Sequence, residues 1–174
     1  MALDVDPVRV AGRWFKHAYH GSVALVLRNP PPDSRWQRGD AVHALYLADE
    51  EDTAWAEWYR HLAELGVPPA KQMPRDLWTW EVDVELADLS DPARLARVGL
   101  GMPKPGRSGW PAYQRVGETL HNEGWPGLLA PSAARPEHAV MCLFRNGNAV
   151  VGAVPHAPPK TVADPPAPPT GMTT

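Results

Sequence analysis

The clearest hydrophobic pattern in the chain is an alternation of apolar and polar residues at positions 78–86. Trp, Trp, Val, Val and Leu occupy the even positions, and Thr, Glu, Asp and Glu occupy the odd ones. This period of two predicts a β-strand with one buried face and one wet face. The carboxylates of the wet face, Glu81, Asp83 and Glu85, are thereby explained without a catalytic role.

The short apolar run at 44–48 predicts a buried strand. After it, the apolar residues follow the spacing of a helix. Asp52 or Thr53 can cap a helix that continues to about Leu65, where Gly66 suits the left-handed end of a helix. The apolar residues of this segment form one stripe at helical spacing: Ala54, Trp55, Trp58, Leu62 and Leu65.

Two further helices are predicted in the second half of the chain. Ser90-Asp91-Pro92 is typical of a helix start, and this short helix should end near Gly99. A loop of Gly, Pro and basic residues at 101–109 separates it from a helix predicted at 111 to about 123.

Strands are predicted in three apolar runs of this half: 127–130, 139–144 and, beyond a turn at Asn146-Gly147, 149–154. Together these elements predict a single α+β domain with a mixed, largely antiparallel sheet and flanking helices. After about Ala153 the chain is dominated by Pro, with Ala and Thr. Proline removes backbone donors and favours solvated, extended chain, so we expect a folded domain at 1–152 and a disordered tail at 153–174.

Composition and charge narrow the classes of function. A chain of 174 residues with 44% hydrophobic residues suffices for one packed domain. A formal charge of −3 is not the basic footprint of a nucleic-acid or anionic-membrane binder. The sequence shows no secretory signal and no apolar run near the roughly 20 residues of a membrane helix. The single cysteine, Cys142, fits a reducing compartment, so we expect a cytoplasmic protein.

Generic catalytic motifs do not occur in the sequence. It has no Gly-rich phosphate loop, HExxH, paired CxxC or GxSxG motif. His17 and His20 are close in sequence but have no evident third ligand, so we predict no metal site.

Four short segments in a particular order are more informative: SRWQRG at 34–39, LYLA at 45–48, TAWAE at 53–57 and APSAA at 130–134. From about Trp14 to Phe144 the chain resembles the RES family, which is named for an arginine, a glutamate and a serine. The resemblance implies an ADP-ribosyltransferase-like fold. It also implies the toxin of a bacterial type II toxin–antitoxin system that degrades NAD⁺.

The resemblance assigns roles by position. Arg35 matches the family arginine, Glu57 the glutamate and Ser132 the serine, and these are the candidate catalytic residues. Tyr46 matches a pocket tyrosine whose flat face can stack on nicotinamide or adenine. Lys16, in the step WFKH, stands where the family usually has an arginine. Lysine keeps the charge but lacks the planar fork that grips phosphate oxygens.

The implied reaction is cleavage of the nicotinamide–ribose bond of NAD⁺. Nicotinamide is already a cationic leaving group. The enzyme therefore has to stabilise the positive charge that develops on the ribose, and the Glu57 carboxylate suits that role. Arg35 suits the pyrophosphate or an attacking phosphate, and Arg28 or Arg38 could take that role instead. Ser132 could hold a phosphate or ribose oxygen, but not act as a nucleophile, because no base is identifiable beside it.

The resemblance also implies partners and leaves alternatives open. The expected partners are NAD⁺ as substrate, with inorganic phosphate or water as acceptor, and an Xre-like helix-turn-helix antitoxin in a hetero-oligomer. No further cofactor is expected. One alternative is an ADP-ribosyltransferase that modifies a protein or nucleic acid. Another is an inactive RES domain that only binds a partner, for which Lys16 is the support in the sequence.

Overall fold

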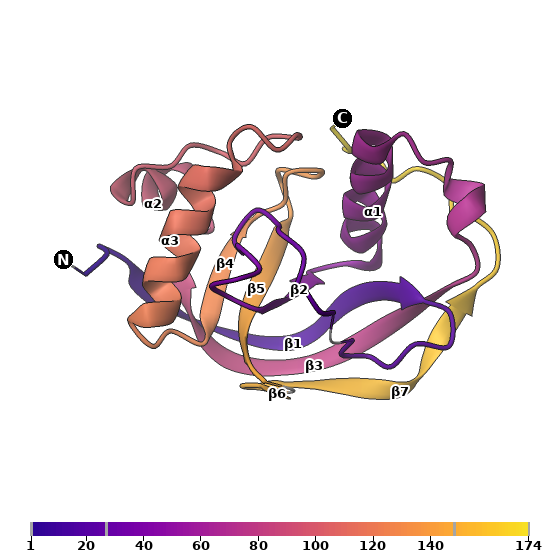
Figure 1. The fold of residues 1–174 in the computed structure, drawn as a ribbon, viewed down its shortest axis with the longest axis horizontal. Coiled ribbons are helices and arrows are strands. Elements are labelled where there is room, and N and C mark those ends of the chain that lie inside the picture. Colours follow the sequence, from indigo (N-terminus) through magenta and orange to yellow (C-terminus); the bar gives the residue numbers. More distant parts are fainter. Residues whose placement is uncertain (1, 27, 148, 174) are drawn as a thin grey trace.

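The computed structural model describes residues 2–26, 28–147 and 149–173. Two long strands, β1 (Asp6–Tyr19) and β3 (Arg75–Asp88), pair antiparallel along their whole length. They form the curved base of the molecule in Figure 1. Glu81, Asp83 and Glu85 are exposed on β3 while the alternating apolar residues are buried, as the period of two predicted.

The remaining strands close this base into a ring. β2 (Ala44–Ala48), β5 (Ala139–Asn146) and β4 (Gly127–Pro131) link β1 back to β3 through the pairings β1–β2, β2–β5, β5–β4 and β4–β3. Of these pairings only β4–β3 is parallel. β6 (Ala149–Val150) pairs antiparallel with the end of β5, and β7 (Ala153–Val162) pairs antiparallel with β3. The described chain is therefore the single α+β domain that was expected, with a mixed and mostly antiparallel sheet.

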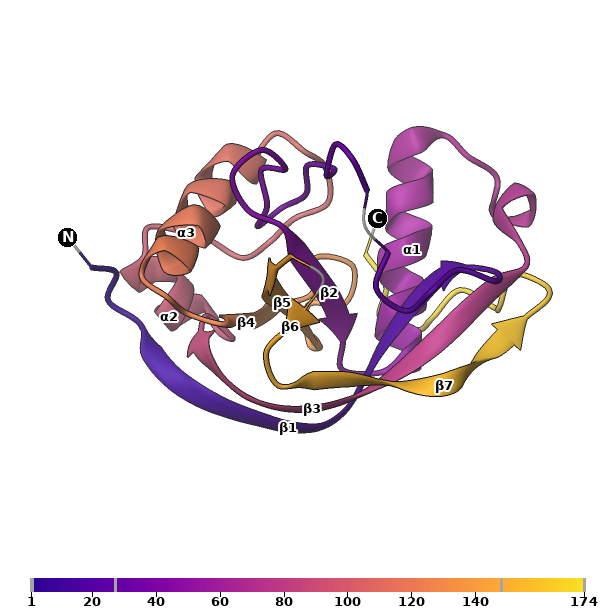
Figure 2. The same cartoon turned by 60° about the horizontal axis from the view of Figure 1, so that its bottom comes forward.

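Helices lie at both ends of the ring. α1 (Glu51–Leu65) is at one end, followed by the 3₁₀ turn η1 (Pro69–Gln72), and α2 (Pro92–Arg97) and α3 (Trp110–Asn122) lie at the other (Figures 1 and 2). α1 ends at Gly66 with φ 64°, as predicted. No helix in the described part of the chain is long and apolar enough to cross a membrane.

β1 is the element that the sequence analysis missed. Its buried residues Val10, Trp14 and Ala18 are four apart, because Gly12 and Lys16 occupy the inward positions between them. Trp14 faces Trp80 of β3 across the pair. Side chains on a strand alternate between its faces, so the same register that buries Trp14 turns the Lys16 ammonium inward. The sequence therefore shows no apolar and polar alternation here, and its one signal is the spacing of Val10, Trp14 and Ala18 by four residues.

The predicted disordered tail is wrong for Ala153–Val162, which form β7. This strand pairs with β3 along one edge, and prolines are tolerated on an edge strand because only some of its backbone groups need partners. The following residues also pack on the domain, where the Arg135 Nε atom donates to the Thr170 carbonyl at 3.1 Å. The folded unit therefore extends beyond residue 152.

Candidate active site

Two adjoining cavities lie between α1, β1, β2 and the loop before β2. One, of about 330 Å³, is lined by Glu57 and Arg35, and we call it the carboxylate lobe. The other, of about 510 Å³, is lined by Arg75 and Arg145, and we call it the basic lobe. Lys16 lines both, and so do several neighbours, so the lobes form one continuous cleft. Such volumes are in the usual range for small-ligand sites.

The structure places the predicted glutamate and serine in direct contact. Glu57 lies on the side of α1 that faces the end of β4, and its Oε1 atom accepts from the Ser132 hydroxyl at 2.6 Å. The Ala134 backbone N–H also points at Oε1, at 3.2 Å. The Oε2 atom accepts from the Arg60 guanidinium at 2.9 Å. Donors on both oxygens fix the orientation of the carboxylate at the wall of the lobe.

Ser132 serves Glu57 rather than the cavity. Its side chain is fully buried, and its hydroxyl oxygen accepts from the backbone N–H groups of Ala134 and Arg135 at 3.2 and 3.0 Å. Pro131 and Ala133 line the carboxylate lobe on either side of it. The role predicted for Ser132, contact with a phosphate or ribose oxygen, is therefore replaced in this geometry by positioning of the carboxylate.

The loop that carries Ser132 is itself anchored by Arg135. The Arg135 guanidinium is buried, and its Nη1 atom donates to Thr53 Oγ1 at 3.0 Å and to Glu50 Oε2 at 3.1 Å, both at the start of α1. Its Nε atom donates to the carbonyl of Thr170 near the C-terminus. One side chain thus ties together the serine loop, the helix that carries the glutamate, and the C-terminal segment.

The predicted arginine and tyrosine lie on the same lobe. The Arg35 guanidinium donates to the Lys104 carbonyl at 2.7 Å and lies over the Tyr113 ring, with its Cζ atom 5.3 Å from the ring centroid. Burial lowers the pKa of Arg35, and the nearby Arg60 guanidinium lowers it further. The Tyr46 hydroxyl accepts from the Trp36 backbone N–H at 3.1 Å, which fixes the loop that presents Arg35.

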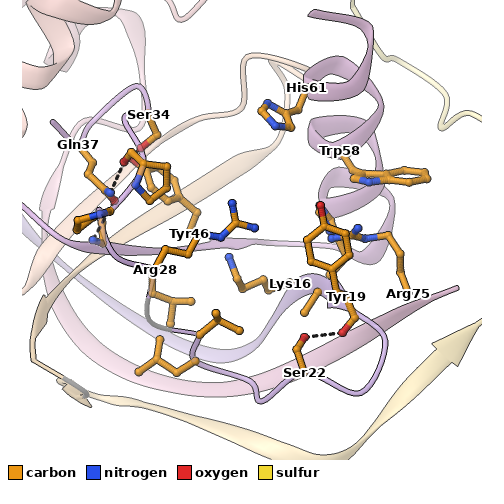
Figure 3. A pocket seen from close by; sticks show the side chains of 18 of the residues that line it. Lys16, Tyr19, Ser22, Arg28, Ser34, Gln37, Tyr46, Trp58, His61 and Arg75 are labelled. Atoms are coloured by element: carbon orange, nitrogen blue, oxygen red, sulfur yellow. Dashed lines mark hydrogen bonds between the residues drawn. The ribbon is translucent and has the colours of Figure 1, made fainter. Parts of the chain in front are cut away.

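Lys16 lies where the two lobes meet. Figure 3 shows it with Arg28 in the middle of the cavity, between Tyr46 on one side and Tyr19 and Arg75 on the other. Burial lowers the pKa of Lys16 to about 8, and the positive charges of Arg28, Arg145 and Arg75 contribute in the same direction. No ion pair of Lys16 occurs among the described residues. Lys16 is thus an amine enclosed by the protein in strongly positive surroundings.

Several cleft residues were not singled out as ligands by the sequence. Arg60 and Arg75 come from α1 and the start of β3, and Arg145 comes from the end of β5. His17 was considered only as a metal ligand, but its Nδ1 atom accepts from the Arg75 Nε atom at 3.1 Å, whereas His20 bonds to Asp76. In the described residues no cluster of three metal-ligating side chains occurs. Nothing in the local sequence of these arginines marked them as cleft residues.

Comparison with known proteins agrees with this architecture. The sequence profile of the RES domain matches residues 6–166, a span that includes β1 and β7. No curated protein sequence matches the chain. Among solved structures, a chain of the MbcT–MbcA toxin–antitoxin complex of M. tuberculosis is similar in fold, with a TM-score of 0.70 and 19% identity over 86% of each chain. The profile match over most of its length shows that the chain belongs to the RES domain family.

Proposed function

We propose that this protein is the toxin of a toxin–antitoxin system and that it cleaves the nicotinamide–ribose bond of NAD⁺. The observation that carries the proposal is the Glu57 carboxylate, held by Ser132, Ala134 and Arg60 at the wall of a cleft rich in cations. A fixed carboxylate suits a positively charged transition state, and the surrounding cations suit the phosphates of the same substrate. Membership of the RES family and the fold shared with a chain of a toxin–antitoxin complex support it.

The charge balance around Glu57 is consistent with this role. Arg60 pairs with both Glu57 and Glu64, so two carboxylates share one guanidinium and the trio keeps one net negative charge. As the bond to nicotinamide breaks, positive charge grows on the ribose, and this negative charge would stabilise it. The leaving group is already cationic, so no general acid is required.

The other predicted residues would bind and orient the substrate. Arg35 would pair with the pyrophosphate or with an attacking phosphate, since its guanidinium lines the lobe beside Glu57. Lys16 would contact the phosphates at the junction of the lobes. Tyr46 would offer a ring face to a base, because its hydroxyl is turned away to Ser34 and Trp36. The nucleophile would be water or inorganic phosphate.

The direct test is consumption of NAD⁺ by the purified chain, followed by nicotinamide release, with and without inorganic phosphate. We expect consumption in both the presence and the absence of an added protein acceptor. A rate that depends on phosphate, with ADP-ribose 1″-phosphate as product, would identify phosphorolysis, and ADP-ribose would identify hydrolysis. An Xre-like antitoxin that covers the cleft should abolish the activity.

Two results would contradict this proposal. Transfer of label from NAD⁺ to a protein or nucleic acid, without free ADP-ribose or its phosphate, would identify an ADP-ribosyltransferase. Failure of a correctly folded chain to consume NAD⁺ under any of these conditions would identify an inactive domain that only binds a partner.

The pH dependence of NAD⁺ cleavage should reflect the protonation of the Lys16 amine. We expect kcat/KM for NAD⁺ to fall roughly tenfold as pH rises through about 8, because deprotonation of Lys16 removes one positive charge from the free enzyme's cleft. His17 and His61 both have lowered pKa values, so they stay neutral over this range. A guanidinium remains protonated, so Lys16→Arg should lack the fall.

The measurement is a kcat/KM profile from about pH 6.5 to 9.5 for the wild type, Lys16→Arg and the exposed control Lys71→Arg. The control should retain the wild-type profile. A fall that persists unchanged in Lys16→Arg would assign the titration to another group.

A further inference from the structure

We propose that the basic lobe binds a phosphate on the adenosine ribose of the substrate, so that the protein uses NADP⁺ in preference to NAD⁺. This inference rests on the proposed function, because the site of bond cleavage at Glu57 orients the dinucleotide along the cleft. It adds the identity of the adenosine half, which neither the reaction nor the Glu57 geometry specifies.

The basic lobe is lined by positive charge without negative charge. Lys16, Arg28, Arg75 and Arg145 line it, and no Asp or Glu is among its described lining residues. None of the four has a carboxylate oxygen within 4.0 Å in the described part of the chain. Arg75 is buried, Lys16 and Arg145 are partly buried, and Arg28 is exposed. Taking unpaired charges out of water is costly, and the mutual repulsion of the four cations adds to that cost. In a protein of net charge −3, such a cluster indicates an anionic ligand.

Two of these guanidiniums are held in place by the fold. Arg75 donates through Nε to His17, and its Cζ atom lies 4.4 Å from the centroid of the Tyr19 ring. Arg145 donates through Nη1 to the Val26 carbonyl at 2.8 Å. Its Nε and Nη2 atoms are buried and have no partner among the described residues. Unpaired buried donors of this kind are costly to the protein. Neither atom is accessible from the cleft, so a ligand phosphate would accept from them only after the side chain turns toward it.

The number of positive charges in the cleft favours a ligand with more negative charge than one pyrophosphate carries. Across the whole cleft five cations lack a carboxylate partner in the described residues: Lys16, Arg28, Arg35, Arg75 and Arg145. The pyrophosphate of NAD⁺ supplies two negative charges. A phosphate monoester on the adenosine ribose adds roughly 1.5 to 2 more at neutral pH, so the phosphates of NADP⁺ offset about four of the five positive charges and those of NAD⁺ offset two.

Glu57 lines only the carboxylate lobe, whereas Arg75 and Arg145 line only the basic lobe, so a phosphate on the adenosine ribose would lie at the end away from Glu57. With the nicotinamide ribose at Glu57, the pyrophosphate meets Lys16 and Arg28 where the lobes join, and the adenosine extends into the basic lobe. Figure 3 shows Tyr19 and Arg75 on the far side of Lys16 from Tyr46. The adenosine end therefore has both a ring face and guanidiniums beside it.

The first test compares kcat/KM for NADP⁺ and NAD⁺ in the wild type, Arg145→Gln and Arg115→Gln. Arg115 is an exposed arginine of α3 outside the cleft, so its variant controls for loss of one charge. We expect the wild type to favour NADP⁺, and the ratio of the two kcat/KM values to fall about tenfold or more in Arg145→Gln but not in the control. A preference for NAD⁺, or equal losses for both dinucleotides, would overturn the inference while leaving the proposed function intact.

The second test measures binding alone and separates the two proposals if neither dinucleotide is consumed. Calorimetry compares adenosine 2′,5′-bisphosphate with adenosine 5′-diphosphate, which carry the same number of phosphates in different places. We expect the 2′,5′ isomer to bind the full chain about tenfold more tightly, and Arg145→Lys to retain more of this difference than Arg145→Gln. Tighter binding of the 5′-diphosphate would show that the lobe holds the pyrophosphate instead. Circular dichroism on each variant verifies folding, and Arg28→Gln replaces Arg145→Gln if the latter is unfolded.

Discussion

Glu57→Gln is expected to lower kcat for NAD⁺ cleavage roughly 10²- to 10³-fold, the usual effect of removing one electrostatic stabiliser of a transition state. The substitution keeps the size of the side chain and leaves an oxygen to accept from Ser132 and Ala134. It removes the negative charge that the growing charge on the ribose requires. The variant should therefore fold and bind the substrate, so KM should change much less than kcat.

Kinetics of NAD⁺ consumption and thermal unfolding of the same samples would check this expectation. Glu85→Gln is the matched control, because Glu85 is exposed on β3 and forms no hydrogen bond through its side chain in the described residues. In cells, production of the wild type should deplete NAD⁺ and stop growth, whereas Glu57→Gln should do neither. Wild-type turnover in a folded Glu57→Gln protein would remove the carboxylate from the mechanism.

Gly117→Ala is expected to destabilise the fold by about 3 kcal/mol, at the upper end of the usual cost of overpacking. A Cβ atom on Gly117 of α3 would lie 2.2 Å from the backbone oxygen of Trp36. That backbone cannot easily retreat, because the Trp36 N–H donates to the Tyr46 hydroxyl and the Gln114 side chain holds the carbonyl of Ser34. The helix and the loop that presents Arg35 would have to separate.

Urea unfolding of Gly117→Ala and Gly101→Ala would measure this effect. A Cβ atom on Gly101 would meet nothing within 4 Å, and its φ is not positive, so this control should change the free energy of unfolding by less than about 0.5 kcal/mol. We also expect kcat/KM to fall in Gly117→Ala, since Arg35 adjoins Trp36. Equal stability of the two variants would show that the contact between α3 and the loop is not tight.

Local patterns predicted the elements that carry their own signal. The strict alternation at 78–86 identified β3, and the apolar stripe closed by Gly66 identified α1. Motif order identified the family, and with it Arg35 and Glu57, which both line the carboxylate lobe. These predictions succeeded because strand alternation, helical spacing and motif order are all properties of residues near one another in the sequence.

Long-range pairing decided the elements that the sequence analysis missed or misassigned. β7 is rich in proline, and its own sequence carries no pattern that predicts a strand. The free edge of β3 orders it by pairing with the backbone groups that the prolines leave available. β1 carries Gly12 and Lys16 at inward positions, which interrupts its apolar pattern until the pairing with β3 sets the register. A sheet edge or register depends on residues many positions away.

The same distinction applies to the site. The sequence by itself determined the family, the α+β class and the residue types that the proposed chemistry needs, because these follow from local spacing and from motif order. Only the tertiary structure decided that Ser132 holds Glu57 instead of facing the cavity. It also decided that Arg75 and Arg145 meet Lys16 in one lobe. The reason is physical: the electrostatics of a cleft depends on which charges folding brings together and removes from water, and these residues lie on separate strands.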